Sequence, residues 1–282
     1  MKRLIYVLVA ITTFSSCELV ESYLNKDDSN DEIVEVFAQE LTFTTSINSL
    51  TKVTESNFET GDVIAVTAYD ASGALINNAT QYKYNGSLFT SDDPIIYDYE
   101  DAVYSFYAIY PTISSLQSSI DFYAQSDQSI DGAYTQSDML FASLTSSDTV
   151  PQLTFNHTMS SIVVNIIDEE ASSVTFYAKI ALRYGVQTNS TTTLGDSQSV
   201  IPAINGSSSY KAIVAPQTVV TGTTIATCTV GSLTHDWVLD ADFEMVSGKQ
   251  YIFNWSIADR EVTLDSIINE WDIVDMGTIE SK

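Results

Sequence analysis

The chain has 282 residues, enough for one large or two ordinary domains, and a formal net charge of −26 at pH 7. A surface this acidic repels nucleic acid and anionic lipid headgroups, so we expect no nucleic-acid partner. Apolar residues make up 44% of the sequence, which excludes a wholly disordered chain.

The N-terminus has the pattern of a secretory signal peptide that ends at a cysteine. A basic start, an apolar stretch over residues 4–14 and two serines precede Cys17. The apolar stretch is shorter than the ~20 residues that a spanning helix needs. The position of Cys17 resembles the lipobox of bacterial lipoproteins, which implies cleavage after a signal peptide of residues 1–16, acylation of Cys17 (palmitate among the acyl chains) and a lipid anchor in the membrane. The alternative is a signal peptide without lipidation, followed by a chance cysteine.

Residues 17–33 are acidic and poor in large apolar side chains, and we interpret them as a flexible tether. From residue 34 onward the pattern is that of an all-β chain. The apolar run over residues 63–69 ends at a turn signal, and Asn85-Gly86 between two short apolar runs predicts a β-hairpin. Residues 103–110 are apolar on both faces, which predicts a strand that is covered on both sides.

The second half of the chain continues the same pattern. Apolar positions alternate with polar ones over residues 174–182 and again over residues 251–257, which predicts two half-buried strands. No sustained apolar repeat of 3.6 residues follows the signal peptide. We therefore expect two β-sandwich domains, over residues 34–150 and 151–282.

The sequence carries no recognisable catalytic or metal-binding motif. HExxH, GxSxG and CxxC are absent. We interpret His157 as a structural histidine near the domain junction, His235 as an exposed hairpin residue and Cys228 as a buried strand residue. We therefore expect no enzyme activity, no metal and no cofactor. The rival class is a surface hydrolase with a carboxylate pair, whose separation in space the sequence does not give.

Some aromatic side chains are candidates for contact with a ligand. Tyr97 and Tyr99 are flanked by acidic residues, and Trp237 lies next to a charged hairpin. For Tyr104, Tyr107 and most other aromatic residues, packing across strands in a core is the favoured interpretation.

A series of short motifs occurs in order between residues 51 and 271, and together they resemble the fimbrillin-like (Mfa-like) family of Bacteroidetes. The motifs include TKV and FETGDVIAV at 51–66, YKYNGSLF at 82–89, AIYP at 108–111, DMLFA at 138–142, LTFNHTMSS at 153–161, APQ at 215–217, GKQY at 248–251 and INEW at 268–271. The resemblance implies two tandem β-sandwich domains of transthyretin-like, Greek-key type. It also implies a surface lipoprotein of the outer membrane that becomes a structural or adhesive pilus subunit.

The resemblance further implies assembly by strand exchange with other fimbrial subunits, as a homo- or hetero-polymer. A strand within residues 33–45 would be removed by a protease together with the lipid, and a neighbour's strand would replace it. The candidate donor strand holds Ile273, Val274, Met276 and Ile279. The candidate cleavage site is Lys52, because the sequence has no arginine between Arg3 and Arg183; cleavage by another protease and no cleavage stay open. The alternative function is a surface lipoprotein that binds a host glycan or protein without polymerising.

Overall fold

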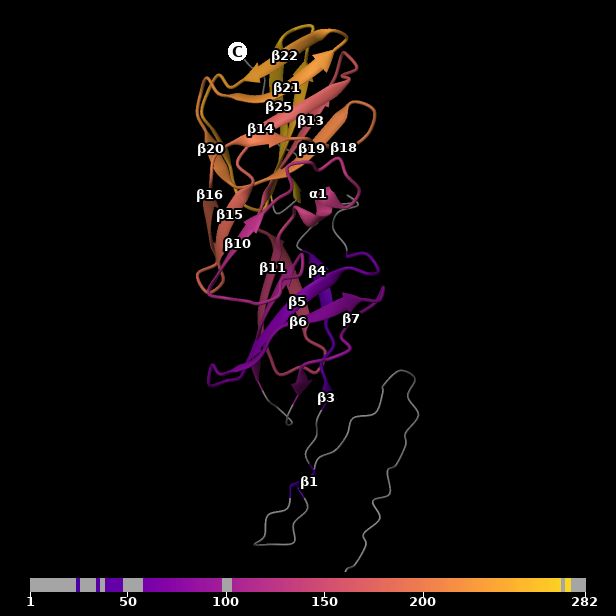
Figure 1. Ribbon diagram of the computed structural model, residues 1–282, viewed down its shortest axis with the longest axis vertical. Coiled ribbons are helices and arrows are strands. Elements are labelled where there is room, and N and C mark those ends of the chain that lie inside the picture. The colour runs from indigo at the N-terminus through magenta and orange to yellow at the C-terminus, as the bar shows by residue number, and fades with distance from the viewer. Residues whose placement is uncertain are drawn as a thin grey trace, which may run out of the picture.

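The structure is a computed structural model that describes residues 24–25, 34–35, 39–47, 58–97, 103–269 and 272–274. Within these ranges the chain is almost entirely β, as predicted, with one short helix, α1 (Ala133–Gln136). The strands build two hydrophobic cores that follow one another along the long axis of the molecule (Figure 1). In the described part of the chain, no helix is long and apolar enough to cross a membrane.

The first core lies against a seven-stranded sheet. Its strands, in spatial order, are β4 (Thr44–Ile47), β12 (Gln152–His157), β11 (Leu140–Ser146), β9 (Tyr104–Tyr110), β5 (Val63–Tyr69), β6 (Leu75–Tyr84) and β7 (Phe89–Thr90). All neighbours in this sheet are antiparallel except β4 and β12, which are parallel. The first core is rich in aromatic rings, with Phe43, Tyr82, Phe89, Phe106 and Phe155 all buried.

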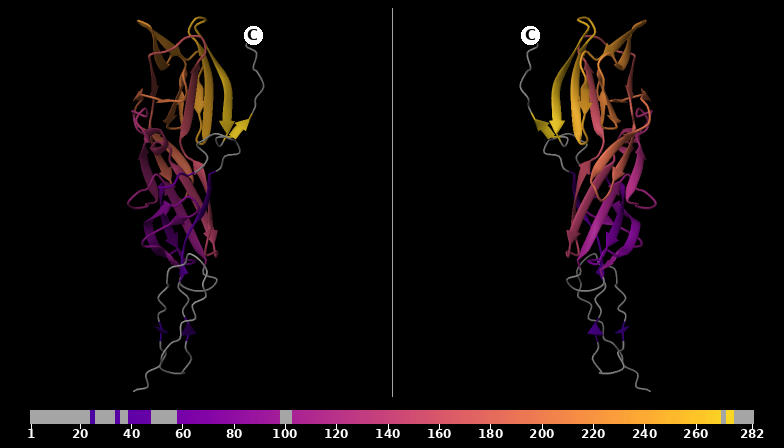
Figure 2. Two further views of the ribbon diagram at one scale, coloured as in Figure 1. Left: turned by 90° about the vertical axis from the view of Figure 1, so that its right-hand side faces the viewer. Right: turned by 90° about the vertical axis from the view of Figure 1, so that its left-hand side faces the viewer.

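The second core lies between two larger sheets. The six-stranded sheet runs β18 (Ala203–Ile204), β19 (Ser209–Val214), β13 (Ser160–Ile166), β24 (Lys249–Ser256), β25 (Glu261–Asn269) and β26 (Asp272–Val274). The four-stranded sheet runs β17 (Gln198–Val200), β14 (Ser173–Ala178), β21 (Thr224–Val230) and β22 (Leu233–Val238). Figure 2 shows β24, β25 and β26 at one side of this half of the molecule.

Smaller sheets complete the described part of the chain. A three-stranded sheet contains β10 (Ser119–Tyr123), β15 (Ala181–Gly185) and β16 (Ser190–Leu194). Three pairs of strands remain: β20 (Gln217–Val219) with β23 (Phe243–Met245), β3 (Gln39–Glu40) with β8 (Ile96–Tyr97), and β1 (Leu24–Asn25) with β2 (Val34–Glu35).

Two sets of strand pairings cross the expected domain boundary at residues 150 and 151. Strand β12 follows that boundary in sequence but belongs to the seven-stranded sheet, and β10 precedes it but pairs with β15. The rings of Phe141 on β11 and Tyr184 on β15 both belong to the second core, and their centroids lie 4.7 Å apart. The chain therefore passes between the cores more than once, and the domain limits stay a prediction.

The predicted hairpin at Asn85-Gly86 is confirmed, since β6 and β7 flank it and pair in antiparallel register. Gly86 has a φ of 100°, a backbone conformation that favours glycine. The Asn85 side-chain oxygen accepts hydrogen bonds from the backbone N–H groups of Ser87 and Leu88, both at 2.9 Å. The sequence signal and the turn chemistry agree at this point.

The prediction of one strand over residues 174–182 is wrong. The structure has β14 and β15 there, and they lie in different sheets. The side chain of Gln217 accepts a hydrogen bond from the backbone N–H of Lys179 at 3.1 Å and donates one to its carbonyl at 3.0 Å. The Lys179 carbonyl also accepts from the Ala215 N–H at 2.9 Å, so the backbone groups of Lys179 bond to residues 215 and 217 and the ladder of β14 ends before Lys179.

The strand over residues 103–110 is covered on both sides only near its end. Tyr104 and Phe106 face the first core, while Ile109 joins the second core from the opposite face. Residue Val103 is 41% exposed.

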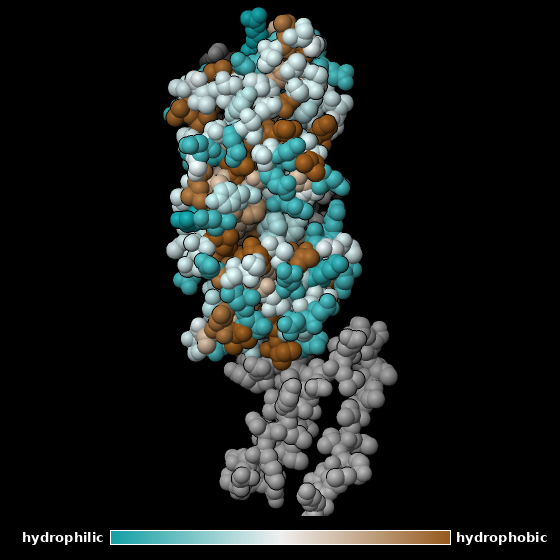
Figure 3. Space-filling model, viewed as in Figure 1, coloured by the Kyte–Doolittle hydropathy of each residue, from teal (hydrophilic) through white to brown (hydrophobic). Residues whose placement is uncertain are grey.

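The outer surface shown in Figure 3 carries apolar side chains scattered among polar ones.

Candidate functional site

The N-terminal residues 41–47 form an integral part of the first core. Leu41 and Phe43 are fully buried and Ile47 is 9% exposed. Their alternation matches the period of two of an extended strand whose one face is covered. The burial of three large apolar side chains makes this segment a stabilising element, on the order of 1.5–3 kcal/mol for each fully buried side chain.

Residues 41–47 are hydrogen-bonded to strands on both sides. The backbone groups of Phe43 and Phe89 exchange hydrogen bonds of 3.2 and 2.9 Å, and the Leu41 N–H donates to the Ile95 carbonyl at 2.9 Å. On the other side, β4 pairs in parallel with residues 152–155 of β12. The segment therefore fills a slot between two parts of the first sandwich that come from later in the chain.

The ring of Phe43 occupies the centre of this slot. Its centroid lies 4.9 Å from that of Tyr82 and 5.3 Å from that of Phe106, with both contacts edge to face. Loss of residues 41–47 would leave those two rings facing an empty slot and would leave the outer edge of β12 without a partner strand.

The predicted donor residues Ile273 and Val274 lie in β26, at the outer edge of the six-stranded sheet. Ile273 pairs with Ile268, and Val274 pairs with Ile267. Met276 and Ile279, the other two candidates, lie outside the described residues. Strand β26 is the last strand of its sheet and is held by a single neighbour among the described residues, β25.

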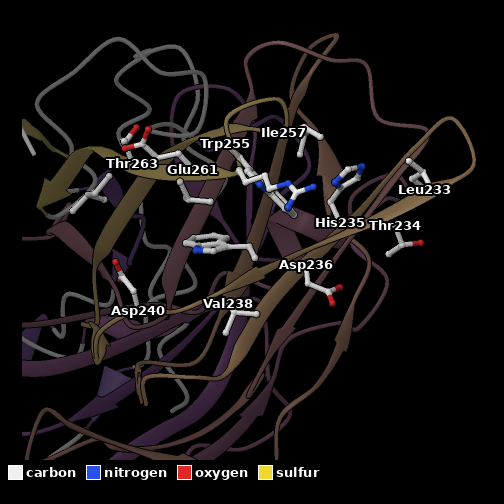
Figure 4. A pocket seen from close by; sticks show the side chains of 14 residues that line it. Leu233, Thr234, His235, Asp236, Val238, Asp240, Trp255, Ile257, Glu261 and Thr263 are labelled. Atoms are coloured by element: carbon white, nitrogen blue, oxygen red, sulfur yellow. The ribbon is translucent and has the colours of Figure 1, made fainter.

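A groove of about 820 Å³ opens between β22 and β25 in the second half (Figure 4). The labelled residues of β22, such as Leu233 and His235, line one side, and Glu261 and Thr263 of β25 line the other. Strand β22 is the last strand of the four-stranded sheet, so the groove is an open side of the second sandwich.

The candidate ligand contact Trp237 is a core residue that also lines this groove. It is 6% exposed, and its ring lies 4.7 Å from Phe253 and 6.3 Å from Trp255. Tyr97 ends β8 and pairs with Gln39 through the backbone, while its side chain lies outside the described part. Tyr99, Cys17 and Lys52 also lie outside the described residues.

His157 and Cys228 are buried in the fold, and His235 lies in a pair of strands. His157 Nδ1 lies 2.6 Å from Asp138 Oδ2, and the His157 side chain is 2% exposed, which confirms its structural interpretation. Cys228 is a buried residue of β21, and burial raises the pKa of its thiol to about 11. His235 lies on the β21–β22 hairpin. Among the described residues, no group of three or more His, Cys, Asp or Glu side chains is placed to hold a metal ion.

The fold and its edges define a class of protein: an all-β chain of two hydrophobic cores in which residues 41–47 fill a slot made by strands from later in the chain. The chain belongs to the fimbrillin-like family, whose model matches residues 51–271. No curated protein matches the chain.

Solved structures share this fold. A proposed cell adhesion protein from Bacteroides ovatus has a TM-score of 0.67 at 16% identity, over 85% of this chain and 100% of that one. A proposed cell adhesion protein from Bacteroides uniformis has a TM-score of 0.64 at 17% identity, over 83% and 99% of the two chains. The tip fimbrial protein Mfa3 from Porphyromonas gingivalis has a TM-score of 0.53 at 10% identity, over 82% and 99%. At these identities the similarity establishes the fold.

Proposed function

We propose that this chain is a surface-exposed fimbrial subunit, structural or adhesive, that joins other fimbrial subunits by strand exchange. The observation that carries the proposal is the burial of Leu41 and Phe43 in a slot bounded on both sides by strands of the rest of the chain. A strand near one end of the chain can be exchanged for a neighbour's strand, because the walls of the slot do not depend on the chain continuing through it.

Proteolytic removal of the residues up to Lys52 would take out the whole of the segment 41–47. The freed edge of β12 would then offer its N–H and C=O groups to a strand from another subunit. Since the donor and the slot lie in different parts of the subunit, repetition of this contact gives an open fibre rather than a closed ring.

The donor in this proposal is the strand that includes Ile273, Val274, Met276 and Ile279. Its described part, β26, lies at a sheet edge with one neighbouring strand, so its release breaks one ladder of pairs. Its four candidate residues are large and apolar, as are Leu41, Phe43 and Ile47, which fill the slot in this structure.

Before processing, the chain would be held at the outer membrane by lipid on Cys17. Several acyl chains on one cysteine give a stable anchor, since each buried CH₂ contributes about 0.8 kcal/mol. The role is structural or adhesive rather than catalytic, because fimbrial assembly depends on main-chain pairing and apolar burial.

Two measurements on native cells test this proposal together. Mass spectrometry of the N-terminus of the cell-derived protein is expected to find lipid on Cys17 in one pool and a start after Lys52 in the other. Electron microscopy with labelled antibody is expected to place the second pool on filaments. A single pool that keeps residues 18–52 and is spread over the cell surface without filaments would contradict the proposal.

A further inference from the structure

We propose that a groove on the outer face of the seven-stranded sheet binds a neutral oligosaccharide, an activity beyond the assembly function proposed above. Three neighbouring strands place Tyr69, Ser105 and Thr145 in one row, since Tyr69 pairs with Ser105 and Ser105 pairs with Thr145. Tyr107 follows two residues along β9 and lies on the same face. This face points away from the first core, which takes Tyr104 and Phe106.

The two tyrosines form a fixed aromatic surface in the groove. Their ring centroids are 5.8 Å apart with ring planes at 86°, and Tyr107 also packs at 6.3 Å against Phe141. Both side chains remain partly exposed. A tyrosine ring offers an apolar face beside a hydroxyl group, which suits a sugar ring with its C–H face and hydroxyl rim. The hydroxyls of Ser105 and Thr145, 3.0 Å apart, extend this polar rim.

Two neighbouring loop segments beside the sheet also line the groove. Residues 116–118 and 186–187 line the groove side by side, since the Val186 N–H donates to the Ser118 carbonyl at 3.0 Å. Asn78 of β6 fixes the first segment to the sheet, because its side-chain oxygen accepts from the Leu116 N–H at 2.8 Å. The volume of about 640 Å³ lies within the range of small-molecule sites, and a preformed groove lowers the ordering cost of binding.

Apart from Asp70, the polar side chains that line the groove are neutral. Gln117 and Gln187 are exposed, and each amide can donate and accept hydrogen bonds to sugar hydroxyls. Of the described residues that line the groove, Asp70 alone is charged at pH 7, and none is a lysine or arginine. The Asp70 Oδ1 atom accepts from the backbone N–H groups of Ser72 and Ala74 at 2.9 and 2.8 Å, so it is engaged in its own turn. An anionic sugar would find no cation in the groove and a chain of net charge −26 around it, which favours a neutral ligand.

The test titrates the full chain by calorimetry with β-1,4-linked hexasaccharides of glucose, xylose and mannose, and with hexagalacturonate as the anionic probe. At least one neutral hexasaccharide is expected to bind with a Kd of about 1 mM or tighter, and hexagalacturonate is expected not to bind. Y69A and Y107A are each expected to weaken binding at least about tenfold. Y123A removes a tyrosine that is 64% exposed on β10 and does not line the groove, so it is the matched control and is expected to bind unchanged.

A second variant covers the case in which Y107A does not fold. The double variant Q117A and Q187A changes exposed loop side chains only, and it is expected to weaken binding at least about fivefold with an unchanged circular dichroism spectrum. The proposal is overturned if none of the three neutral hexasaccharides binds. It is also overturned if hexagalacturonate binds as tightly as they do, or if the groove variants bind as well as Y123A.

Discussion

The ring of Phe43 meets the ring of Tyr82 edge-on, with the two centroids 4.9 Å apart. Tyr82 in turn accepts a hydrogen bond from the Ile95 backbone N–H at 2.8 Å through its hydroxyl oxygen, and burial raises the pKa of Tyr82 above its usual value. The contact joins a residue near the start of the described chain to β6 of the seven-stranded sheet. Residues 41–47 are therefore part of the first core, in the position that a replaceable strand requires.

The substitution F43A is expected to destabilise the uncut chain by about 3–5 kcal/mol, because it leaves a cavity beside Tyr82 and Phe106. Urea unfolding followed by circular dichroism measures the change. The control is L75A, on the same strand as Tyr82 but 51% exposed, which is expected to stay within about 0.5 kcal/mol of the parent. If the two variants were equally stable, the segment would not be a structural part of the core.

The substitution W237A tests whether Trp237 is a core residue or a ligand contact. Because its ring packs on Phe253 at 4.7 Å, we expect a loss of about 3–5 kcal/mol in the free energy of unfolding. L233A, on the same strand and 64% exposed, is the matched control. A W237A protein as stable as L233A would favour the ligand interpretation over the core interpretation.

The thiol of Cys228 is expected to be unreactive in the native protein. Burial raises its pKa to about 11, so little thiolate forms at pH 8, and the side chain is 1% exposed. In a C17S background, a thiol reagent at pH 8 is expected to modify almost no native protein and one thiol per chain in urea. Rapid stoichiometric modification of the native chain would show that β21 is open to solvent.

The carboxylate of Asp168 is expected to contribute to the pH dependence of stability. Desolvation opposes its charged form, but hydrogen bonds from the backbone N–H groups of Ile257 and Ala258 and from the Ser256 hydroxyl outweigh it and lower the pKa below 3.8. A lowered folded-state pKa stabilises the protein above the unfolded-state pKa, and this contribution is lost as the pH falls through the folded-state pKa.

D168N is therefore expected to lower stability at pH 7 by less than about 1 kcal/mol, since the group is solvent-exposed, and to have a smaller effect near pH 2. Thermal unfolding midpoints between pH 2 and pH 7 measure the difference. E169Q, one residue further along, is the control. A D168N effect of equal size at both ends of the pH range would contradict the role of the charge.

Local sequence patterns predicted much of the fold because strands and turns have local causes. The run over residues 63–69 is β5 in the structure, and Asn85-Gly86 is the turn between β6 and β7. The break between β14 and β15 was not predictable in the same way, since it depends on Gln217, which lies far along the chain from Lys179. The crossing of β10 and β12 between the two halves has the same origin, because pairing partners distant in sequence decide it.

The candidate sites also depend on contacts between residues distant in sequence, which local sequence patterns do not predict. The alternation of Leu41 and Phe43 is visible in the sequence, but the slot that holds them is made by β7 and β12, which only the folded chain brings together. The groove at Tyr69 and Tyr107 could not be predicted from the sequence either. The sequence shows that both are aromatic residues in predicted strands, but it does not show which residues of the two strands pair. The pairing of Tyr69 with Ser105 is what places the two rings on one face.

The most direct test of the strand-exchange account places a site-specific protease sequence at residue 52 and compares the cut and uncut chains by electron microscopy and sedimentation. We expect the uncut chain to be monomeric and the cut chain to form head-to-tail filaments. A cut chain that also lacks residues 273–279 is expected to form none. A cut chain that stays monomeric, or that forms the same filaments without residues 273–279, would contradict the exchange of the N-terminal strand for a neighbour's C-terminal strand.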